Sequence, residues 1–247
     1  MITDALIAEL EKIQEPGKLL AELARRFPGG QVGVALSGQV SDSALVDMAV
    51  KAGAEVRFYT VDTLRVFPET LELMTALEKR YPGVKIERLT PDPKEVASMV
   101  EEHGEYLFFD SKAKQELCCR IRKVFPNQRM LDVLDVWVTG LRADQSHSRA
   151  KVPRLEIIQH KNRPLLKVSP LADWKEVQVR EYLKANQVPV HKLLEAKLPG
   201  GFYYESLGCV ICTTPIGPNE PRRAGRWRWF NTEDNKKECG LHLPENT

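Results

Sequence analysis

Five cysteines give this sequence its most specific chemical signal, and four of them form two pairs. Cys118 and Cys119 are adjacent in KQELCCRIRK, a helical segment, and Cys209 and Cys212 form a C-x2-C pair in SLGCVICTTP. Consecutive Cα atoms lie about 3.8 Å apart, which is shorter than the usual span of a disulfide, so a bridge within the adjacent pair is disfavoured. Four thiolates can instead bind Zn²⁺ or an iron–sulfur cluster. Spacing favours the wider cluster but leaves a zinc site and no metal as alternatives.

The fifth cysteine, Cys239, lies in KKECGLH near the C-terminus, close in sequence to Lys236, Lys237 and His242. Neighbouring cations lower the pKa of a thiol and so increase its thiolate fraction at neutral pH. The glycine that follows leaves room for a reaction partner to approach. These features fit a nucleophilic cysteine, and they also fit a free thiol at the surface.

The polar segment SGQVSDS, residues 37–43, lies between an apolar run and a helical pattern. Where a parallel strand ends and a helix begins, backbone N–H groups and the positive helix dipole favour a phosphate or sulfate. The segment matches neither a Walker A loop nor G-x-G-x-x-G, so an ordinary polar turn remains an alternative. Its candidate anion-binding residues are Ser37, Gly38, Ser41, Asp42 and Ser43.

Basic residues gather in two further segments. GLRADQSHSRAK follows a predicted strand and contains Arg142 and Arg149, and PRRAGRWRWF contains Arg223 and Arg226 among aromatic residues. A guanidinium grips a phosphate or sulfate through two donors at once, so both segments are candidate anion clamps. For the second segment, a nucleic-acid surface with stacking rings and a plain solvated surface remain alternatives.

Alternating strands and helices must position these residues. Apolar spacing predicts helices over 3–13, 17–27, 44–52, 68–80 and 93–103, and strands over 32–36, 54–63, 84–89 and 134–140. This alternation predicts an α/β fold with a mainly parallel sheet and helices on both faces. Asp173 is the predicted N-cap of a later helix. We expect N-terminal helices over 1–30, an α/β domain over 31–190, and an irregular C-terminal segment over 191–247 that packs on it.

Composition excludes several classes of protein. The 247 residues include 36 Lys plus Arg and 34 Asp plus Glu, and 43% are hydrophobic, which is too apolar and too balanced in charge for a disordered tail. No apolar run is long enough to span a bilayer. The N-terminus lacks the basic-then-apolar order of a signal peptide, which predicts a cytoplasmic protein with reduced cysteines. A net charge of +2 favours no polyanion in bulk, so an anion site would be local.

Taken together, these motifs resemble the assimilatory adenylyl-sulfate (APS) reductases, within the family that includes the phosphoadenylyl-sulfate (PAPS) reductases. The similarity covers about residues 30–243 and follows the family's order through VDTLRVFPET, CCRIRK, WVTGLRADQS, PLADW, GCVICT, RAGRW and ECGLH. The resemblance implies an adenine nucleotide alpha hydrolase-like fold, in which residues 31–190 form the nucleotide-binding domain and the C-terminal segment carries the nucleophile.

The resemblance also implies a reaction, the thioredoxin-dependent reduction of APS to sulfite and AMP in sulfate assimilation. Cys239 would attack the sulfur, expel AMP and form an S-sulfocysteine, from which thioredoxin or glutaredoxin releases sulfite. Attack on an anionic sulfate needs cations, and Lys123, Arg223 and Arg226 match family residues that supply them. The other implied substrate-binding residues are those of the 37–43 segment, Arg142, Arg149 and His242.

The set of four paired cysteines resembles that of the subgroup that holds a 4Fe-4S cluster, with Cys118, Cys119, Cys209 and Cys212 as ligands. Because thioredoxin supplies both electrons by thiol exchange, we expect an electrostatic and structural role for the cluster, with Lys123 linking it to the sulfate. Relatives commonly self-associate, so a homo-oligomer is expected, whereas nucleic acid and membrane are not expected as partners.

Other functions remain open at this point. A PAPS reductase would use the same mechanism. An ATP-using α/β ligase or sulfurtransferase would fit the strand–loop–helix unit but not ECGLH. A zinc-binding nucleic-acid module would fit the Arg- and Trp-rich segment.

Overall fold

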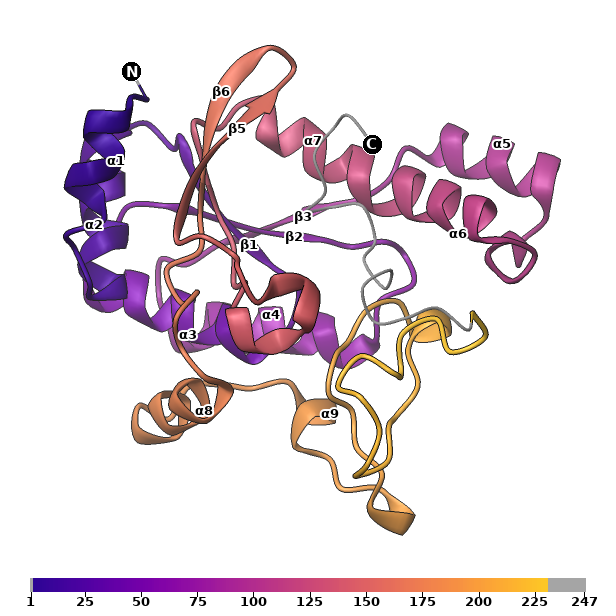
Figure 1. Cartoon of the computed structure of the whole chain (residues 1–247). Coiled ribbons are helices and arrows are strands. Elements are labelled where there is room, and N and C mark those ends of the chain that lie inside the picture. The colour runs from indigo at the N-terminus through magenta and orange to yellow at the C-terminus, as the bar shows by residue number, and fades with distance from the viewer. Residues whose placement is uncertain (1, 231–247) are drawn as a thin grey trace.

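A six-stranded sheet with the order β3-β2-β1-β4-β6-β5 lies at the centre of the computed structural model, which describes residues 2–230 (Figure 1). The parallel strands are β1 (Val32–Leu36), β2 (Arg57–Val61), β3 (Ile86–Leu89), β4 (Val136–Val138) and β6 (Arg163–Val168). β5 (Leu155–His160) pairs antiparallel with β6 at one edge. The predicted α/β fold with a mainly parallel sheet is confirmed.

Helices cover both faces of this sheet, as predicted (Figure 1). The main core lies on one face, where apolar side chains of β1, β4 and β6 contact α1 (Asp4–Leu10), α2 (Pro16–Arg26), α3 (Val40–Lys51), α4 (Pro68–Arg80) and α8 (Glu176–Ala185). α7 (Phe125–Leu131) covers the other face, where Met130 and Leu131 pack with Trp137. Beyond it, α5 (Pro93–His103) lies beside α6 (Lys112–Cys119), and Met99 packs with Cys118.

Local sequence explains where several helices begin. α4 and α5 begin at Pro68 and Pro93, as predicted, because the fixed φ of proline suits the first turn of a helix. Asp92 also accepts a hydrogen bond from the Lys94 N–H at 2.7 Å and so caps α5. No helix within residues 2–230 combines the length and the apolar composition that crossing a bilayer requires.

Two predicted helix starts are wrong. The helix expected from Ala44 begins at Val40, because Gln39 is its N-cap and the Asp42 carboxylate accepts from the Gln39 N–H at 3.0 Å. Asp173 is not an N-cap, since α8 is capped at Lys175, whose N–H donates to the Gln178 side chain at 2.8 Å. In both helices the side chain of the third helical residue accepts a hydrogen bond from the backbone N–H of the capping residue.

The hairpin formed by β5 and β6 was not predicted from the sequence. Its two-residue turn, Lys161 and Asn162, has φ values of 47° and 63°, which matches the left-handed turn that joins twisted strands tightly. The described part of the C-terminal segment, residues 191–230, packs on the sheet domain through Leu194 and Leu207, which belong to the main core. This segment includes the short helix α9 (Lys192–Glu195).

Candidate functional site

One pocket lies at the carboxyl ends of β1, β2 and β4, the edge where parallel sheets commonly bind ligands. It brings together most of the residues that the sequence singled out. Its lining includes Ser37, Asp42, Cys118, Cys119, Lys123, Arg142, Arg149, Cys209, Cys212, Arg223 and Arg226. Ser41 and Ser43 are fully buried instead. Cys239 and His242 lie outside the described residues.

Hydrogen bonds to the Asp42 carboxylate fix the conformation of the 37–43 segment, to which Asp42 itself belongs. Asp42 is buried and accepts hydrogen bonds from the Ser37 N–H at 2.6 Å, the Ser37 hydroxyl at 3.0 Å and the Gln39 N–H at 3.0 Å. Burial raises the pKa of the Asp42 carboxyl, and the hydrogen bonds from Ser37 and Gln39 act in the opposite direction. The Asp42 carboxylate therefore occupies the N–H groups that a phosphate would have used in a simple anion loop.

The end of β4 passes very close to this segment. A Cβ atom added to Gly140 would lie 2.5 Å from Asp42 Oδ1 and 3.0 Å from Ser41 Cβ. Only glycine leaves enough space there, so the positions of Asp42 and the loop depend on a residue about one hundred positions further along the chain.

Arg142 is buried, with 1% of its side chain exposed, and its guanidinium contacts partners within the protein. It donates to the Ser41 hydroxyl at 2.6 Å, to Asp144 at 2.9 Å and to Glu176 at 3.1 Å. Arg222 also pairs with Glu176 and with Glu205. Arg142 thus joins the ends of β4, α3 and α8, and its guanidinium is already neutralised by carboxylates.

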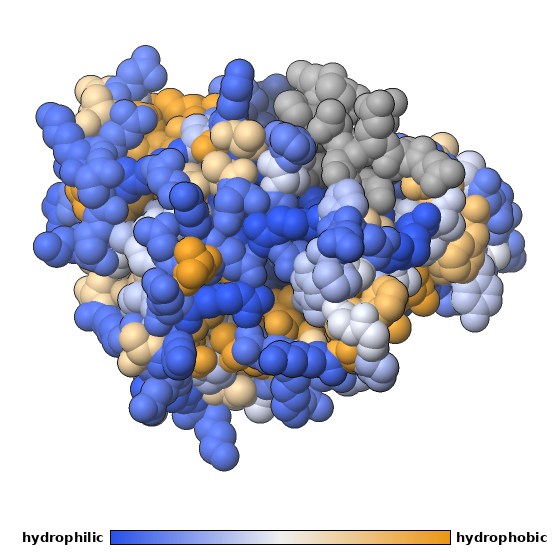
Figure 2. Space-filling view, turned by 60° about the horizontal axis from the view of Figure 1, so that its bottom comes forward, coloured by the Kyte–Doolittle hydropathy of each residue, from blue (hydrophilic) through white to orange (hydrophobic). Residues whose placement is uncertain are grey.

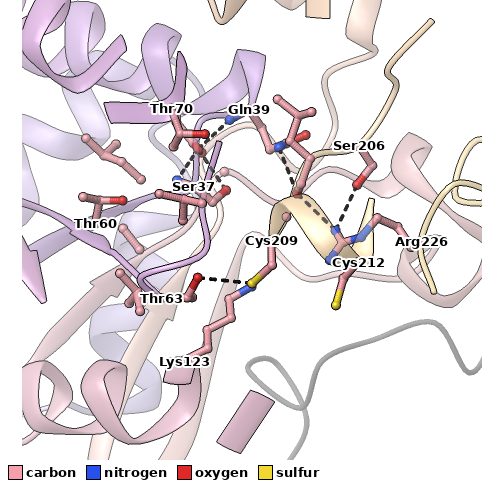
Figure 3. A pocket seen from close by; sticks show the side chains of 18 of the residues that line it. Ser37, Gln39, Thr60, Thr63, Thr70, Lys123, Ser206, Cys209, Cys212 and Arg226 are labelled. Atoms are coloured by element: carbon pink, nitrogen blue, oxygen red, sulfur yellow. Dashed lines mark hydrogen bonds between the residues drawn. The ribbon is translucent and has the colours of Figure 1, made fainter. Parts of the chain in front are cut away.

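The four paired cysteines border the other end of the pocket, and none of them forms a disulfide. Cys118 and Cys119 end α6, whereas Cys209 precedes and Cys212 ends the short 3-10 helix η6 (Val210–Cys212). Cys209 Sγ lies 3.1 Å from the Thr63 hydroxyl (Figure 3). Within residues 2–230, no three His, Cys, Asp or Glu side chains converge closely enough to hold a single metal ion.

A π-helical turn, η2 (Arg120–Val124), follows the adjacent cysteines directly. Pro126 explains this widened turn, because proline lacks an N–H and its ring crowds the carbonyl one turn earlier. Arg122 and Lys123 lie in the turn and line the pocket. Figure 3 shows the Lys123 side chain extending toward Cys209.

Three guanidinium groups at the cysteine end have buried N–H groups that find no hydrogen-bond acceptor among residues 2–230. They are Nη1 of Arg65 and the Nε atoms of Arg122 and Arg226. Leaving buried charged donors unsatisfied costs free energy, which an anionic ligand would recover. The donor chemistry of this end therefore fits anionic groups such as sulfate, thiolates or the sulfides of a cluster.

Arg226 is positioned by close contacts on two sides. Its guanidinium lies 4.7 Å from the centre of the Trp227 ring, and its Nη1 donates to the Leu207 carbonyl at 3.1 Å. A Cβ atom on Gly208 would lie 2.3 Å from Arg226 Nη2, so the glycine before Cys209 makes room for the cation.

The thiols at this end are desolvated. Burial raises the pKa of the Cys118 thiol, and it raises the pKa of Cys212 to about 12, with Cys209 adding to the effect. Arg65 and Arg122 oppose the increase in pKa at Cys118, and Arg226 opposes it at Cys212. The protein thus places a cation against each buried thiol.

Sequence reasoning missed several residues of the site. Thr63 and Arg65 follow β2, and Gln115 donates to Cys119 Sγ at 3.1 Å. The acidic residues Glu176 and Glu205, which pair with the arginines, were also missed. Arg122 and Arg65 stand within CCRIRK and VDTLRVFPET, so the motifs themselves contained a signal for these two.

Comparison with known proteins identifies close relatives. The phosphoadenosine phosphosulfate reductase domain matches residues 31–215. The chain is 38% identical over 228 residues to the adenosine 5'-phosphosulfate reductase of Allochromatium vinosum, covering 92% of this chain and 84% of the relative. It is also 38% identical over 242 residues to the Burkholderia cepacia enzyme of the same name, covering 98% of this chain and 90% of the relative.

Solved structures support the same fold. A phosphoadenylyl-sulfate reductase from Candida auris, in a phosphate complex, superposes with a TM-score of 0.68 at 24% identity, covering 87% of this chain and 98% of that one. The FMN adenylyltransferase of Candida glabrata, in complex with FAD and pyrophosphate, has a TM-score of 0.55 at 12% identity, covering 96% of this chain and 80% of that one.

The close approach of β4 to the loop generates a prediction. Gly140→Ala forces a Cβ atom against Asp42 Oδ1, at 2.5 Å, so the loop must shift. We expect the variant to lose about 1–3 kcal/mol of unfolding free energy in urea titrations. Gly217→Ala is the matched control, since its added Cβ would find no atom nearer than 3.7 Å. Equal stability of the two variants would contradict the role given to Gly140.

Proposed function

Because this chain belongs to the phosphoadenosine phosphosulfate reductase family, we propose that it reduces adenosine 5'-phosphosulfate (adenylyl sulfate, APS) to sulfite and AMP in sulfate assimilation. The single observation that carries the proposal is the cysteine end of the pocket, where four cysteines without a disulfide meet cations with buried, unsatisfied N–H groups. APS rather than PAPS is supported by the names of relatives that align over most of their length.

The first half of the reaction transfers the sulfonyl group to the enzyme. The Cys239 thiolate attacks the sulfur of APS, the bond between that sulfur and the bridging phosphate oxygen breaks, and AMP leaves with the electron pair. The product is an S-sulfocysteine on Cys239. Attack by one anion on another needs positive charge on both the sulfate and the departing phosphate.

The second half returns the enzyme to its thiol form. One thiolate of reduced thioredoxin, or of glutaredoxin, attacks Cys239 Sγ, and sulfite leaves with the electron pair. The second thiol then attacks the mixed disulfide, so the dithiol is oxidised to a disulfide and Cys239 is released. The two electrons therefore come from the dithiol protein.

The cationic residues of the pocket are proposed to have two different roles. Lys123, Arg223 and Arg226 lie at the cysteine end and are proposed to hold the sulfate and the phosphate, with His242 as a further contact from the C-terminal segment. Arg142 donates to Ser41 and to two carboxylates, so it is proposed to act by fixing the 37–43 segment. Arg149 contacts the pocket wall through Gln145, to which its Nη1 donates at 2.6 Å.

The donor set supports a 4Fe-4S cluster held by Cys118, Cys119, Cys209 and Cys212. None of the four forms a disulfide, all four border one pocket, and the unsatisfied N–H groups of Arg65 and Arg122 lie beside them. When bound, the cluster supplies a local electrostatic field and cross-links the two cysteine segments. Lys123, whose side chain extends toward Cys209, is proposed to link that field to the sulfate (Figure 3).

The proposal includes the organisation and setting of the chain. Residues 1–30 form helices that precede a nucleotide-binding domain over 31–190, and residues 191–247 carry the second cysteine pair and the nucleophile. A cytoplasmic location is part of the proposal, in keeping with cysteines that form no disulfide among residues 2–230. Self-association of the chain is also part of the proposal.

Sulfite production tests the function. The wild type is expected to form sulfite from APS with reduced thioredoxin and to form much less from PAPS. Cys239→Ser is expected to lower the rate by about 10³-fold or more, because the attacking thiolate is lost. Mass spectrometry of the wild type with APS and no thioredoxin should find one sulfonated cysteine. Absence of sulfite from either nucleotide, or a sulfonated adduct on the serine variant, would refute the mechanism.

Iron and sulfide analysis tests the cofactor. Anaerobically purified protein is expected to be brown and to contain about four iron and four sulfide per chain. Cys212→Ser should lose most of both, because a cluster ligand is removed. Cys239→Ser should keep them and serves as the control. Colourless protein that holds zinc would show that the four cysteines form a different site.

A further inference from the structure

Large apolar side chains gather on one part of the surface close to the cysteine end of the pocket. Leu64, Tyr106, Phe109 and Val210 are 55%, 65%, 50% and 44% exposed, and they are four of the nine large hydrophobic residues exposed within residues 2–230. On the face seen in Figure 2, polar residues cover most of the surface. We call these four residues the Phe109 surface.

Contacts of Arg65 hold the four residues of this surface together. Leu64 precedes Arg65 in the chain, and the Arg65 carbonyl accepts from the Val210 N–H at 2.8 Å. The Arg65 guanidinium donates to the Glu105 carbonyl at 3.1 Å and lies 5.3 Å from the centre of the Phe108 ring. Three segments distant in sequence therefore meet around Arg65.

Other aromatic rings pack against the exposed ring of Phe109 from the interior of the protein. Phe108 is fully buried, and its ring centre lies 4.7 Å from that of Phe109. The Trp229 ring packs against Phe109 at 4.5 Å, and its Nε1–H donates to the Phe108 carbonyl at 3.1 Å. An exposed aromatic ring held in one orientation loses little conformational entropy on binding, which is typical of residues that dominate protein interfaces.

Leu64 adds a second sign that the surface meets a partner. Its φ of 60° lies in the left-handed region, which costs free energy for a leucine. The Leu64 N–H donates to the Asp62 carboxylate at 2.9 Å, which supports this turn, while the side chain stays more than half exposed. Contact with another molecule would bury that apolar side chain.

The surface lies within reach of the proposed nucleophile. Arg65, Cys209 and Ile211 line the pocket, so the surface borders its cysteine end. Trp229 and Phe230 form its edge, with ring centres 6.0 Å apart, and Cys239 follows Phe230 by nine residues. Nine residues span at most about 30 Å, so a protein docked here stands within reach of Cys239.

We propose that the Phe109 surface is the docking site for the dithiol protein that releases sulfite from Cys239. The inference rests on the proposed function, which requires a protein thiol to approach Sγ of Cys239 after each transfer. The Glu105 side chain is 51% exposed at this surface, and its carboxylate pairs with Arg65. The partner chemistry is thus an apolar patch beside a reactive dithiol.

Separate measurement of the two half-reactions tests this docking site. The test variant is Tyr106→Ser/Phe109→Ser, which removes exposed rings that do not line the pocket. Val133→Ser/Val177→Ser is the control, because it removes two equally exposed apolar side chains elsewhere, at 57% and 56% exposure. Each protein is mixed with APS alone to measure adduct formation, and then with reduced thioredoxin or dithiothreitol to measure sulfite release.

We expect both variants to form the adduct at the wild-type rate and to release sulfite normally with dithiothreitol. The KM for thioredoxin should rise about tenfold or more in Tyr106→Ser/Phe109→Ser only. The single variant Tyr106→Ser, expected to show a smaller rise, provides a second test if the double variant unfolds.

An unchanged KM for thioredoxin would overturn the docking site, and a change from dimer to monomer with an unchanged KM would assign the surface to self-association instead. Failure of the wild type to form any adduct would refute the proposed function itself, which distinguishes the two failures.

Discussion

Buried positive charge beside sulfur is the interaction on which this site depends. Arg65, Arg122 and Arg226 each have a buried N–H group without an acceptor in the described part of the chain, next to thiols whose pKa is raised by burial. The protein alone solvates neither these N–H groups nor these thiols well. The positive N–H groups would stabilise the thiolates once the thiols ionise, and they would likewise stabilise an anion that enters the pocket. A reaction in which a thiolate attacks a sulfate needs such an environment, because positive charge must offset the repulsion between the two anions.

The opposite end of the pocket is built on a different principle. There the cations are paired internally: Arg142 and Arg222 donate to Glu176, and Asp42 satisfies the backbone of the 37–43 segment. The charges at this end are paired, whereas the cysteine end keeps cationic N–H groups without acceptors among residues 2–230. The fold produces the contrast by bringing together the ends of three parallel strands and the segment 203–230, which lies far from them in sequence.

Patterns that depend on near neighbours could be predicted from the sequence. An apolar run correctly predicted β1, and Pro68 and Pro93 correctly predicted where α4 and α5 begin. The roles of single polar residues could not be predicted, because they depend on distant partners. Arg142 was predicted to clamp an anion, but its guanidinium donates to Glu176 and Ser41, which lie 34 and 101 positions away in the sequence. The π-helical turn after Cys119 depends on Pro126, a signal that apolar periodicity does not register.

The claim that buried, incompletely satisfied cations drive the transfer is tested most directly by the rate of adduct formation at saturating APS without reductant. Arg226→Gln should slow this rate by about a hundredfold, because the positive charge at the cysteine end is reduced. Arg228→Gln is the matched comparison, since Arg228 is partly exposed and its guanidinium pairs with Glu220. It should react at the wild-type rate. Equal rates for the two variants would contradict the account.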